Sequence, residues 1–203
     1  MEKLSLRCYA IFSTLAILFL VGYAHHGTQG DREQIAETME QSAVLSNEPL
    51  PSKSKSPIDE GVWAVVHVVD GDTLIVGDSA DKNEQYRVRL IGADTPEVVK
   101  SGTPIEPFGL EASEFTKRMI AEADHRVRIA FDGEQLDKYK RTLAMVYVPT
   151  PDGEVWLNEL LIREGLAHAR LDYRYSHMAK LAFAVAEVEA RQNKRNLWRD
   201  VQE

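Results

Sequence analysis

Two short stretches of the chain carry acidic side chains close together. VVDGDT (68–73) holds Asp70 and Asp72, and RLIGADTPE (89–97) holds Asp94 and Glu97. Each string alone is typical of an ordinary surface turn. Four carboxylates gathered at one place, however, stay ionised together only beside a cation, and calcium or magnesium prefers such oxygen ligands. The chain has no His or Cys cluster for a softer metal, so the pattern indicates a hard divalent ion.

Two arginines accompany these acids in the sequence. Arg89 opens the second acidic stretch, and Arg141 ends the basic run DKYKR (137–141). A guanidinium fork can bond two phosphate oxygens at once. A carboxylate-held cation facing two arginines would therefore bind a phosphate and stabilise extra negative charge on it. By itself the basic run is most typical of a solvated turn, so the phosphate-site interpretation depends on the fold bringing the arginines and acids together.

The elements that must position these residues are mostly strands. Apolar, β-branched runs bounded by turn residues predict strands at 62–69, 73–76, 85–93, 126–131 and 143–148. The dipeptide Asp70-Gly71 predicts a tight hairpin turn with glycine at positive φ. Apolar spacing predicts helices at 109–123, 157–165 and 177–192, with Gly165 capping the second. The fold class expected is mainly β with helices (α+β), a five-stranded OB-like β-barrel packed with about three α-helices.

The N-terminal part of the chain reads differently. Lys3 and Arg7 precede an apolar run from about Cys8 to Ala24, which predicts a signal peptide or, alternatively, a retained membrane anchor. Residues 25–60 are polar and rich in Pro and Ser, and predict a disordered linker before a domain at 61–201. The domain is therefore expected to be exported, secreted or periplasmic, or else anchored outside the cytoplasm. The single cysteine, Cys8, lies in the apolar run, so the domain has no disulfide.

The charge of the chain argues against a simple basic footprint for nucleic acid. The net charge of the chain is −8. From residue 60 onward the sequence has 19 Lys and Arg and 25 Asp and Glu, a net charge of 19 − 25 = −6. Several of these acids are the candidate metal ligands, and a bound divalent ion would offset two charges. Binding of a polyanion is then expected to be weak without metal and sensitive to salt.

Taken together, VVDGDT, RLIGADTPE and DKYKR, followed by GLA (165–167) and NLW (196–198), resemble the staphylococcal nuclease (thermonuclease) family. The order and spacing of the motifs make the resemblance specific, and it covers about residues 61–200. It implies a calcium-dependent nuclease that hydrolyses DNA and RNA with little sequence preference and leaves 3′-phosphate ends. Single-stranded or denatured nucleic acid is the implied partner. Association with a membrane through the N-terminus is open, and no obligate protein partner is implied.

The resemblance also implies roles for individual residues. The calcium ligands would be Asp72 and Asp94, the backbone carbonyl of Thr95 and, through water, Asp70. The catalytic groups would be two arginines on the scissile phosphate and a general base, namely Arg89, Arg141 and Glu97. The substrate contacts would be two residues on a neighbouring phosphate and one beside the base, namely Lys138, Tyr139 and Tyr173; stacking on an aromatic ring is tolerant of base identity.

Two positions depart from the family pattern. Leu171 stands where a second aromatic of the nucleotide pocket is usual, and Tyr175 nearby is a candidate replacement. Lys140 stands where the DKYGR-like loop usually has glycine, which predicts a strained backbone there. The alternative to an enzyme is an OB-like module that binds nucleic acid or protein without cutting it. Non-catalytic relatives typically lack the acids or arginines, and their presence here favours the enzyme.

Overall fold

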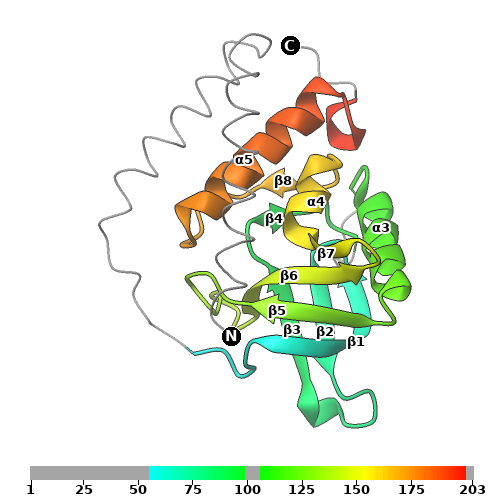
Figure 1. The fold of residues 1–203 in the computed structure, drawn as a ribbon, viewed down its shortest axis with the longest axis vertical. Coiled ribbons are helices and arrows are strands. Elements are labelled where there is room, and N and C mark those ends of the chain that lie inside the picture. The colour runs from blue at the N-terminus through cyan, green and yellow to red at the C-terminus, as the bar shows by residue number, and fades with distance from the viewer. Residues whose placement is uncertain (1–54, 99–105, 200–203) are drawn as a thin grey trace.

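A closed five-stranded barrel forms the centre of the molecule. The computed structural model describes residues 55–98 and 106–199. Its barrel strands are β1 (Gly61–Asp70), β2 (Thr73–Gly77), β3 (Gln85–Leu90), β5 (Arg126–Ala130) and β6 (Thr142–Thr150). Neighbours pair antiparallel except β3 and β6, whose parallel pairing closes the barrel (Figure 1). The expected OB-like α+β fold is confirmed.

One shorter strand extends the barrel sheet and two others form a separate small sheet, and the sequence analysis missed all three as separate elements. β7 (Gly153–Trp156) pairs with β6, and β4 (Ala93–Asp94) pairs antiparallel with β8 (His168–Ala169). The strand predicted at 85–93 is therefore broken after Leu90. Gly92 has φ +79°, and a Cβ there would lie 2.3 Å from a ring carbon of Phe183. The chain turns at this glycine and carries Asp94 off the barrel.

The hairpin between β1 and β2 forms, but not for the reason expected. Asp70 pairs with Thr73, so the two turn residues are Gly71 and Asp72. Gly71 is not among the described glycines with positive φ, so that prediction is wrong. A Cβ at Gly71 would instead lie 2.7 Å from Cγ2 of Thr95 and 2.8 Å from Cβ of Ala112. Glycine is required here because other parts of the chain approach the turn closely.

The three predicted helices are present. α3 (Gly109–Glu122) lies beside the barrel, and α4 (Leu157–Arg163) and α5 (His177–Gln192) lie above it in the view of Figure 1. Two 3₁₀ turns complete the elements, η1 (Lys82–Glu84) and η2 (Asn196–Trp198). The side chain of Ser176 caps α5. Gly165 follows α4 with φ +66°, which confirms its predicted place at the end of that helix.

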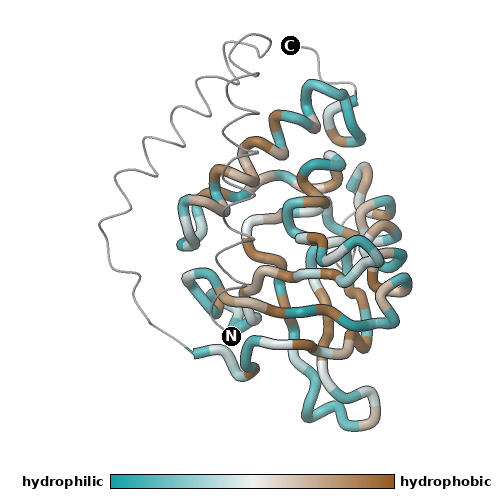
Figure 2. Tube along the Cα trace, in the orientation of Figure 1, coloured by the Kyte–Doolittle hydropathy of each residue, from teal (hydrophilic) through white to brown (hydrophobic). Residues whose placement is uncertain are grey.

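The core lies inside the barrel and between the barrel and the helices. Leu74 and Val88 inside the barrel and Leu161 and Phe183 from the helices are fully buried. Figure 2 shows hydrophobic residues recurring along the barrel strands and the helices. Buried Asn158 at the start of α4 joins the layers: its Oδ1 accepts from Val146 N (2.9 Å), and its Nδ2 donates to the carbonyls of Ile91 (2.8 Å) and Ala144 (3.1 Å). This fixes the turn from which β4 departs.

The packed domain begins slightly before residue 61. Ser56 donates its N–H to Oε1 of Gln135 (2.9 Å), and Ile58 is buried in the core. Residues 56–58 thus belong to the domain and not to a disordered linker. The signal or anchor predicted at 1–24, and the linker up to residue 54, lie outside the described residues. Within residues 55–98 and 106–199, no helix has the length and apolar character needed to cross a bilayer.

Candidate active site

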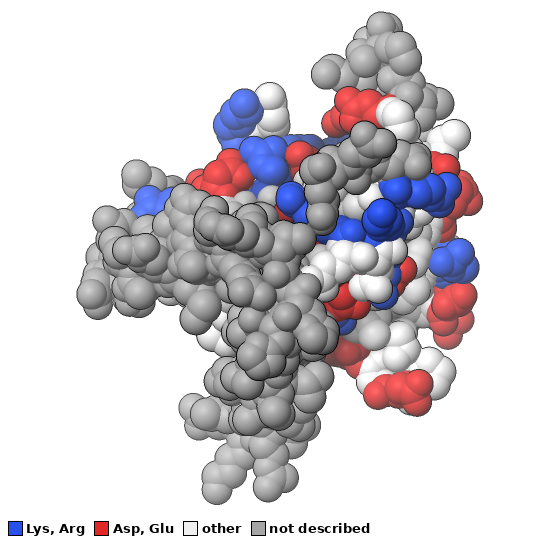
Figure 3. Space-filling view, turned by 90° about the horizontal axis from the view of Figure 1, so that it is seen from above, with Lys and Arg blue, Asp and Glu red and all other residues white. Residues whose placement is uncertain are grey.

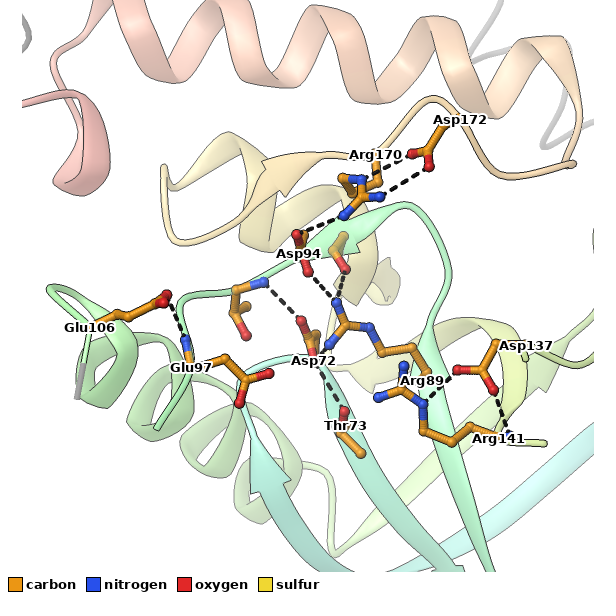
Figure 4. A network of polar contacts seen from close by, with 12 residues as sticks. Asp72, Thr73, Arg89, Asp94, Glu97, Glu106, Asp137, Arg141, Arg170 and Asp172 are labelled. Atoms are coloured by element: carbon orange, nitrogen blue, oxygen red, sulfur yellow. Dashed lines mark hydrogen bonds and ion pairs between the residues drawn. The ribbon is translucent and has the colours of Figure 1, made fainter. Parts of the chain in front are cut away.

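Arg89 lies between the two acids that the sequence analysis took for metal ligands. Its Nη1 donates to Oδ1 of Asp72, and its Nη2 donates to Oδ1 of Asp94 at 2.5 Å (Figure 4). The Nη2 group also reaches the carbonyl oxygen of Ala93 at 3.3 Å. The two acidic stretches, 22 positions apart in the chain (94 − 72), therefore meet at one place, as the metal-site interpretation requires.

The sheet explains why these three side chains meet. Thr73 pairs with Arg89 across β2 and β3, which sets Asp72 next to the end of β3. The N–H of Leu90 donates to the carbonyl of Asp72 (2.9 Å) and holds the turn against that strand. Asp94 returns to the same place because β4 leaves the barrel at Gly92 and pairs with β8. Local sequence supplies the acids, and strand register and the β4–β8 pair bring them together.

Asp72 is the most buried acid of the site. Its side chain has no exposed surface, its Oδ2 accepts from the N–H of Thr95 (2.8 Å), and its Oδ1 accepts from the hydroxyl of Thr73 (3.0 Å). Burial raises the pKa of Asp72 to about 7, and the charge of Asp70 adds to the rise, while Arg89 and the Thr95 N–H oppose it. Thr95 is therefore seen here as an N–H donor to Asp72; its carbonyl makes none of the contacts described.

Asp70 is buried with an incomplete set of partners. Only 8% of its surface is exposed, and its Oδ1 has no hydrogen-bond partner among the described residues. A buried carboxylate oxygen without a partner is costly unless water or a cation satisfies it. The donor set of Asp70, Asp72 and Asp94 consists of hard oxygen atoms and fits calcium or magnesium. In the described part of the chain, however, no three His, Cys, Asp or Glu side chains are arranged to hold an ion.

The loop 137–141 aims the second arginine. Asp137 accepts from the N–H groups of Tyr139 (2.8 Å) and Arg141 (2.9 Å) and from Nε of Arg141 (2.6 Å). Burial disfavours the charge on Arg141, but the hydrogen bond and charge of Asp137 outweigh it and raise the pKa of Arg141. The charge of Asp72 adds to the rise in the pKa of Arg141. Figure 4 shows the Arg141 side chain together with those of Arg89 and Asp72. Lys140 has φ +63°, which confirms the predicted left-handed backbone.

Glu97 lies at the edge of the described site. Its N–H donates to Oε2 of Glu106 (3.0 Å), and its carbonyl accepts from the N–H of Glu106 (3.1 Å). In Figure 4 its carboxylate turns toward the side of Asp72. These contacts fix the backbone of Glu97, and the role of its carboxylate as the base stays a prediction.

The predicted substrate contacts lie on the surface around this centre. Lys138 and Tyr139 are exposed, and the Lys138 ammonium lies 5.0 Å from the Tyr139 ring centroid. Tyr173 is half-buried and packs against the core. Tyr175, considered as a replacement for the aromatic absent at Leu171, is only 3% exposed and packs on Phe183. Its ring belongs to the core, so that suggestion is wrong.

Sequence reasoning missed one pair in this neighbourhood. Arg170 donates from Nη1 to Oδ2 of Asp94 (3.1 Å), and from Nε and Nη2 to the two oxygens of Asp172 (2.9 and 3.0 Å). The only hint in the sequence was an arginine and an aspartate two positions apart in RLDYRY (170–175). Nothing local indicated that they would lie beside Asp94.

The charged surface is mixed, in keeping with the acidic composition of the chain. On the face seen in Figure 3, Lys and Arg side chains are interspersed with Asp and Glu side chains. Many of the arginines are paired with acids, for example Arg128 with Glu154 and Arg163 with Glu189. The guanidinium groups of Arg89, Arg141 and Arg170 are likewise paired with acids, so a polyanion would meet a mixed surface here too.

The fold and site define an OB-like barrel with a carboxylate and guanidinium centre at one end of the β1–β2 hairpin. A family profile described as "Staphylococcal nuclease homologue" matches residues 87–200, more than half of the chain. The chain belongs to this family, which confirms the resemblance inferred from the motifs.

Curated relatives support the same placement. A protein named thermonuclease from Staphylococcus hyicus is 40% identical over 151 residues, covering 74% of this chain and 83% of the relative. A second thermonuclease, from Staphylococcus intermedius, is 41% identical over 147 residues, with 72% and 81% covered. Endonuclease YncB of Bacillus subtilis is 30% identical over 210 aligned positions, with 98% and 92% covered.

Proposed function

We propose that this protein is a calcium-dependent nuclease that hydrolyses phosphodiester bonds of single-stranded or denatured DNA and RNA with little sequence preference, leaving 3′-phosphate ends. The observation that carries the proposal is Arg89 lying between Asp72 and Asp94, with Arg141 in electrostatic range. Relatives named thermonuclease and endonuclease support phosphodiester hydrolysis. Family membership also favours a metal requirement, and the hard oxygen donors favour calcium within it.

In this function Asp72, Asp94 and the backbone carbonyl of Thr95 would bind the ion directly, and Asp70 would bind it through water. When bound, the ion supplies positive charge next to the phosphate under attack. Arg89 and Arg141 would bind the phosphoryl oxygens and stabilise the charge that grows on them in the transition state. Glu97 would accept the proton of the attacking water.

The substrate would be held by the groups around this centre. Lys138 and Tyr139 would contact a neighbouring phosphate, and the half-buried Tyr173 would pack beside a base. Stacking of this kind is tolerant of sequence. With one aromatic in place of two, we expect weaker base binding than in a site with both, and no loss of the hydrolytic groups.

We also propose that the protein is exported. The support is the basic start and apolar run at residues 1–24, which favour a signal peptide over a retained anchor. The mass of the mature N-terminus distinguishes the two. A mature chain that begins after residue 24 supports the signal, and one that keeps the apolar run supports the anchor.

The test of the activity is digestion of denatured DNA by the purified full-length chain in calcium, in magnesium, and after chelation. Digestion in calcium that stops on chelation is expected. Asp94→Ala is the matched variant, because it removes one proposed ligand at a half-exposed position. Digestion that survives chelation would overturn the metal assignment, and absence of digestion with tight DNA binding would favour the non-catalytic module.

A further inference from the structure

We propose that Arg170, held by Asp172, is a positioning residue for Asp94. Its guanidinium fixes the direction of the carboxylate that would ligate the ion, without touching ion or substrate. This inference rests on the proposed function. It concerns two residues that neither the motifs nor the comparisons assign.

The side-chain contacts carry the proposal. One edge of the Arg170 guanidinium, Nε and Nη2, is bound to both oxygens of Asp172 at 2.9 and 3.0 Å. Because the guanidinium is planar, this fork pairing sets the direction of the remaining nitrogen, Nη1. That nitrogen donates to Oδ2 of Asp94 at 3.1 Å (Figure 4). Asp172 therefore aims Arg170 at Asp94.

The backbone fixes the same residue from two sides. The N–H of Arg170 donates to the carbonyl of Gly92 (2.8 Å), directly after the pairing of β4 with β8. The carbonyl of Arg170 accepts from the hydroxyl of Tyr175 (2.7 Å), whose ring is buried on Phe183. Arg170 is thus attached to the core and to the turn that leads to Asp94. The position of Arg170 relative to Asp94 is therefore set by the same backbone that positions β4.

The arrangement gives each oxygen of Asp94 its own partner. Oδ1 accepts from Arg89 and Oδ2 from Arg170. In the proposed function the ion competes with Arg89 for Asp94, so with calcium bound Arg89 no longer restrains this carboxylate, even without nucleic acid. Arg170 is then the remaining group that holds this carboxylate, whose side chain is 37% exposed on a strand of two residues. Hydrogen-bonded partners behind a metal ligand commonly set its orientation and the affinity for the ion.

The opposing interpretation is an ordinary surface ion pair. The side chains of Arg170 and Asp172 are 44% and 64% exposed, and such a pair contributes little to stability. If Arg170 acts only through its positive charge, it repels a cation, and a substitution that removes this charge would tighten calcium binding. As a positioning residue, it favours binding, so its neutralisation would weaken it. The two interpretations predict effects of opposite sign.

Calcium affinity of the full-length chain, measured by titration calorimetry without nucleic acid, separates them. Arg170→Gln removes the charge and the fork, and Arg170→Lys keeps the charge but cannot bond Asp94 and both oxygens of Asp172 together. We expect both variants to bind calcium at least about tenfold more weakly than the wild type. With denatured DNA, kcat should return to within about twofold of wild type at saturating calcium, because the ion then restores the ligand geometry.

Arg128→Gln is the matched control. Arg128 makes the same fork pairing, with Glu154 at 2.7–2.9 Å, at similar exposure on β5 and away from the site. It should leave calcium affinity unchanged, and urea unfolding of all variants checks that they are folded. If the wild type binds calcium and Arg170→Gln binds it equally or more tightly, the positioning role is refuted. If the wild type binds no calcium, the proposed function fails and this inference fails with it.

Discussion

Lys140 offers the sharpest measurement of backbone strain near the site. Its φ of +63° is in the left-handed region, and its N–H donates to the carbonyl of Asp137 (3.0 Å), which closes the turn. The side chain itself is exposed. The residue is therefore held in this conformation by the loop and not by contacts of the lysine side chain, so substitution tests the backbone almost alone.

The magnitude follows from two opposing effects. A residue with a Cβ pays about 1–2 kcal/mol for the left-handed conformation, and glycine avoids this cost. In return, glycine lowers the free energy of unfolding by about 0.4–1 kcal/mol relative to alanine, because it makes the unfolded chain more flexible. The difference predicts that Lys140→Gly is more stable than Lys140→Ala by about 1 kcal/mol. For a domain of this size this corresponds to a rise in Tm of about 2–4 °C.

The comparison of the two variants isolates the effect of φ, because both lack the lysine side chain. Urea unfolding with a common m-value gives the difference in free energy. Turnover should change by less than about twofold, since Asp137 still binds the N–H and Nε of Arg141. Equal stability of Lys140→Gly and Lys140→Ala would refute the reasoning, because it would mean that the left-handed backbone costs nothing at this position.

Three further predictions concern the site and its support. Arg141→Ala should lower kcat on denatured DNA by about 100–1,000-fold while the urea midpoint stays close to wild type, and near-normal turnover would contradict its role. Gly71→Ala should lower the free energy of unfolding by about 1–3 kcal/mol, because its Cβ would lie 2.7 Å from Thr95; an unchanged midpoint would contradict this. Burial raises the pKa of Glu159 to about 7 from an ordinary 4.5, so the unfolded chain releases this proton first and stability falls as pH rises through that window. Between pH 5 and 8 the free energy of unfolding of Glu159→Gln should therefore fall by up to about 3 kcal/mol less than that of the wild type, because glutamine does not titrate. Curves of stability against pH that run parallel for the two proteins would contradict this.

Local pattern predicted most of the barrel and all three helices of the described residues. Long apolar runs such as those around Leu74 and Val146 report burial directly, because a strand that lines a core must carry apolar side chains. The helix that ends before Gly165 was readable for a similar reason, since its stop signal is a single residue with a special backbone. The chemistry of the site was readable as residue types only when the acidic strings and the basic loop were taken together, because each alone is typical of a surface turn.

The pieces that failed to show in the sequence are those decided by long-range contact. β4 and β8 have two residues each, too few for any periodicity. Tyr175 looked available as an aromatic surface, but the fold buries it against Phe183. Gly71 looked like a glycine needed for its positive φ, but the structure needs it because Thr95 and Ala112 approach it from elsewhere in the chain.

The sequence by itself thus determined the kinds of groups this protein has: the carboxylates, the two arginines, the strained Lys140 loop and the strands that carry them. Only the tertiary structure decided that Asp72 and Asp94 share Arg89, and that Arg170 reaches Asp94 from the segment directly after β8. The physical reason is that side-chain identity and short-range backbone preference act over a few residues, whereas the meeting of these groups depends on barrel closure and strand register, which the whole core sets.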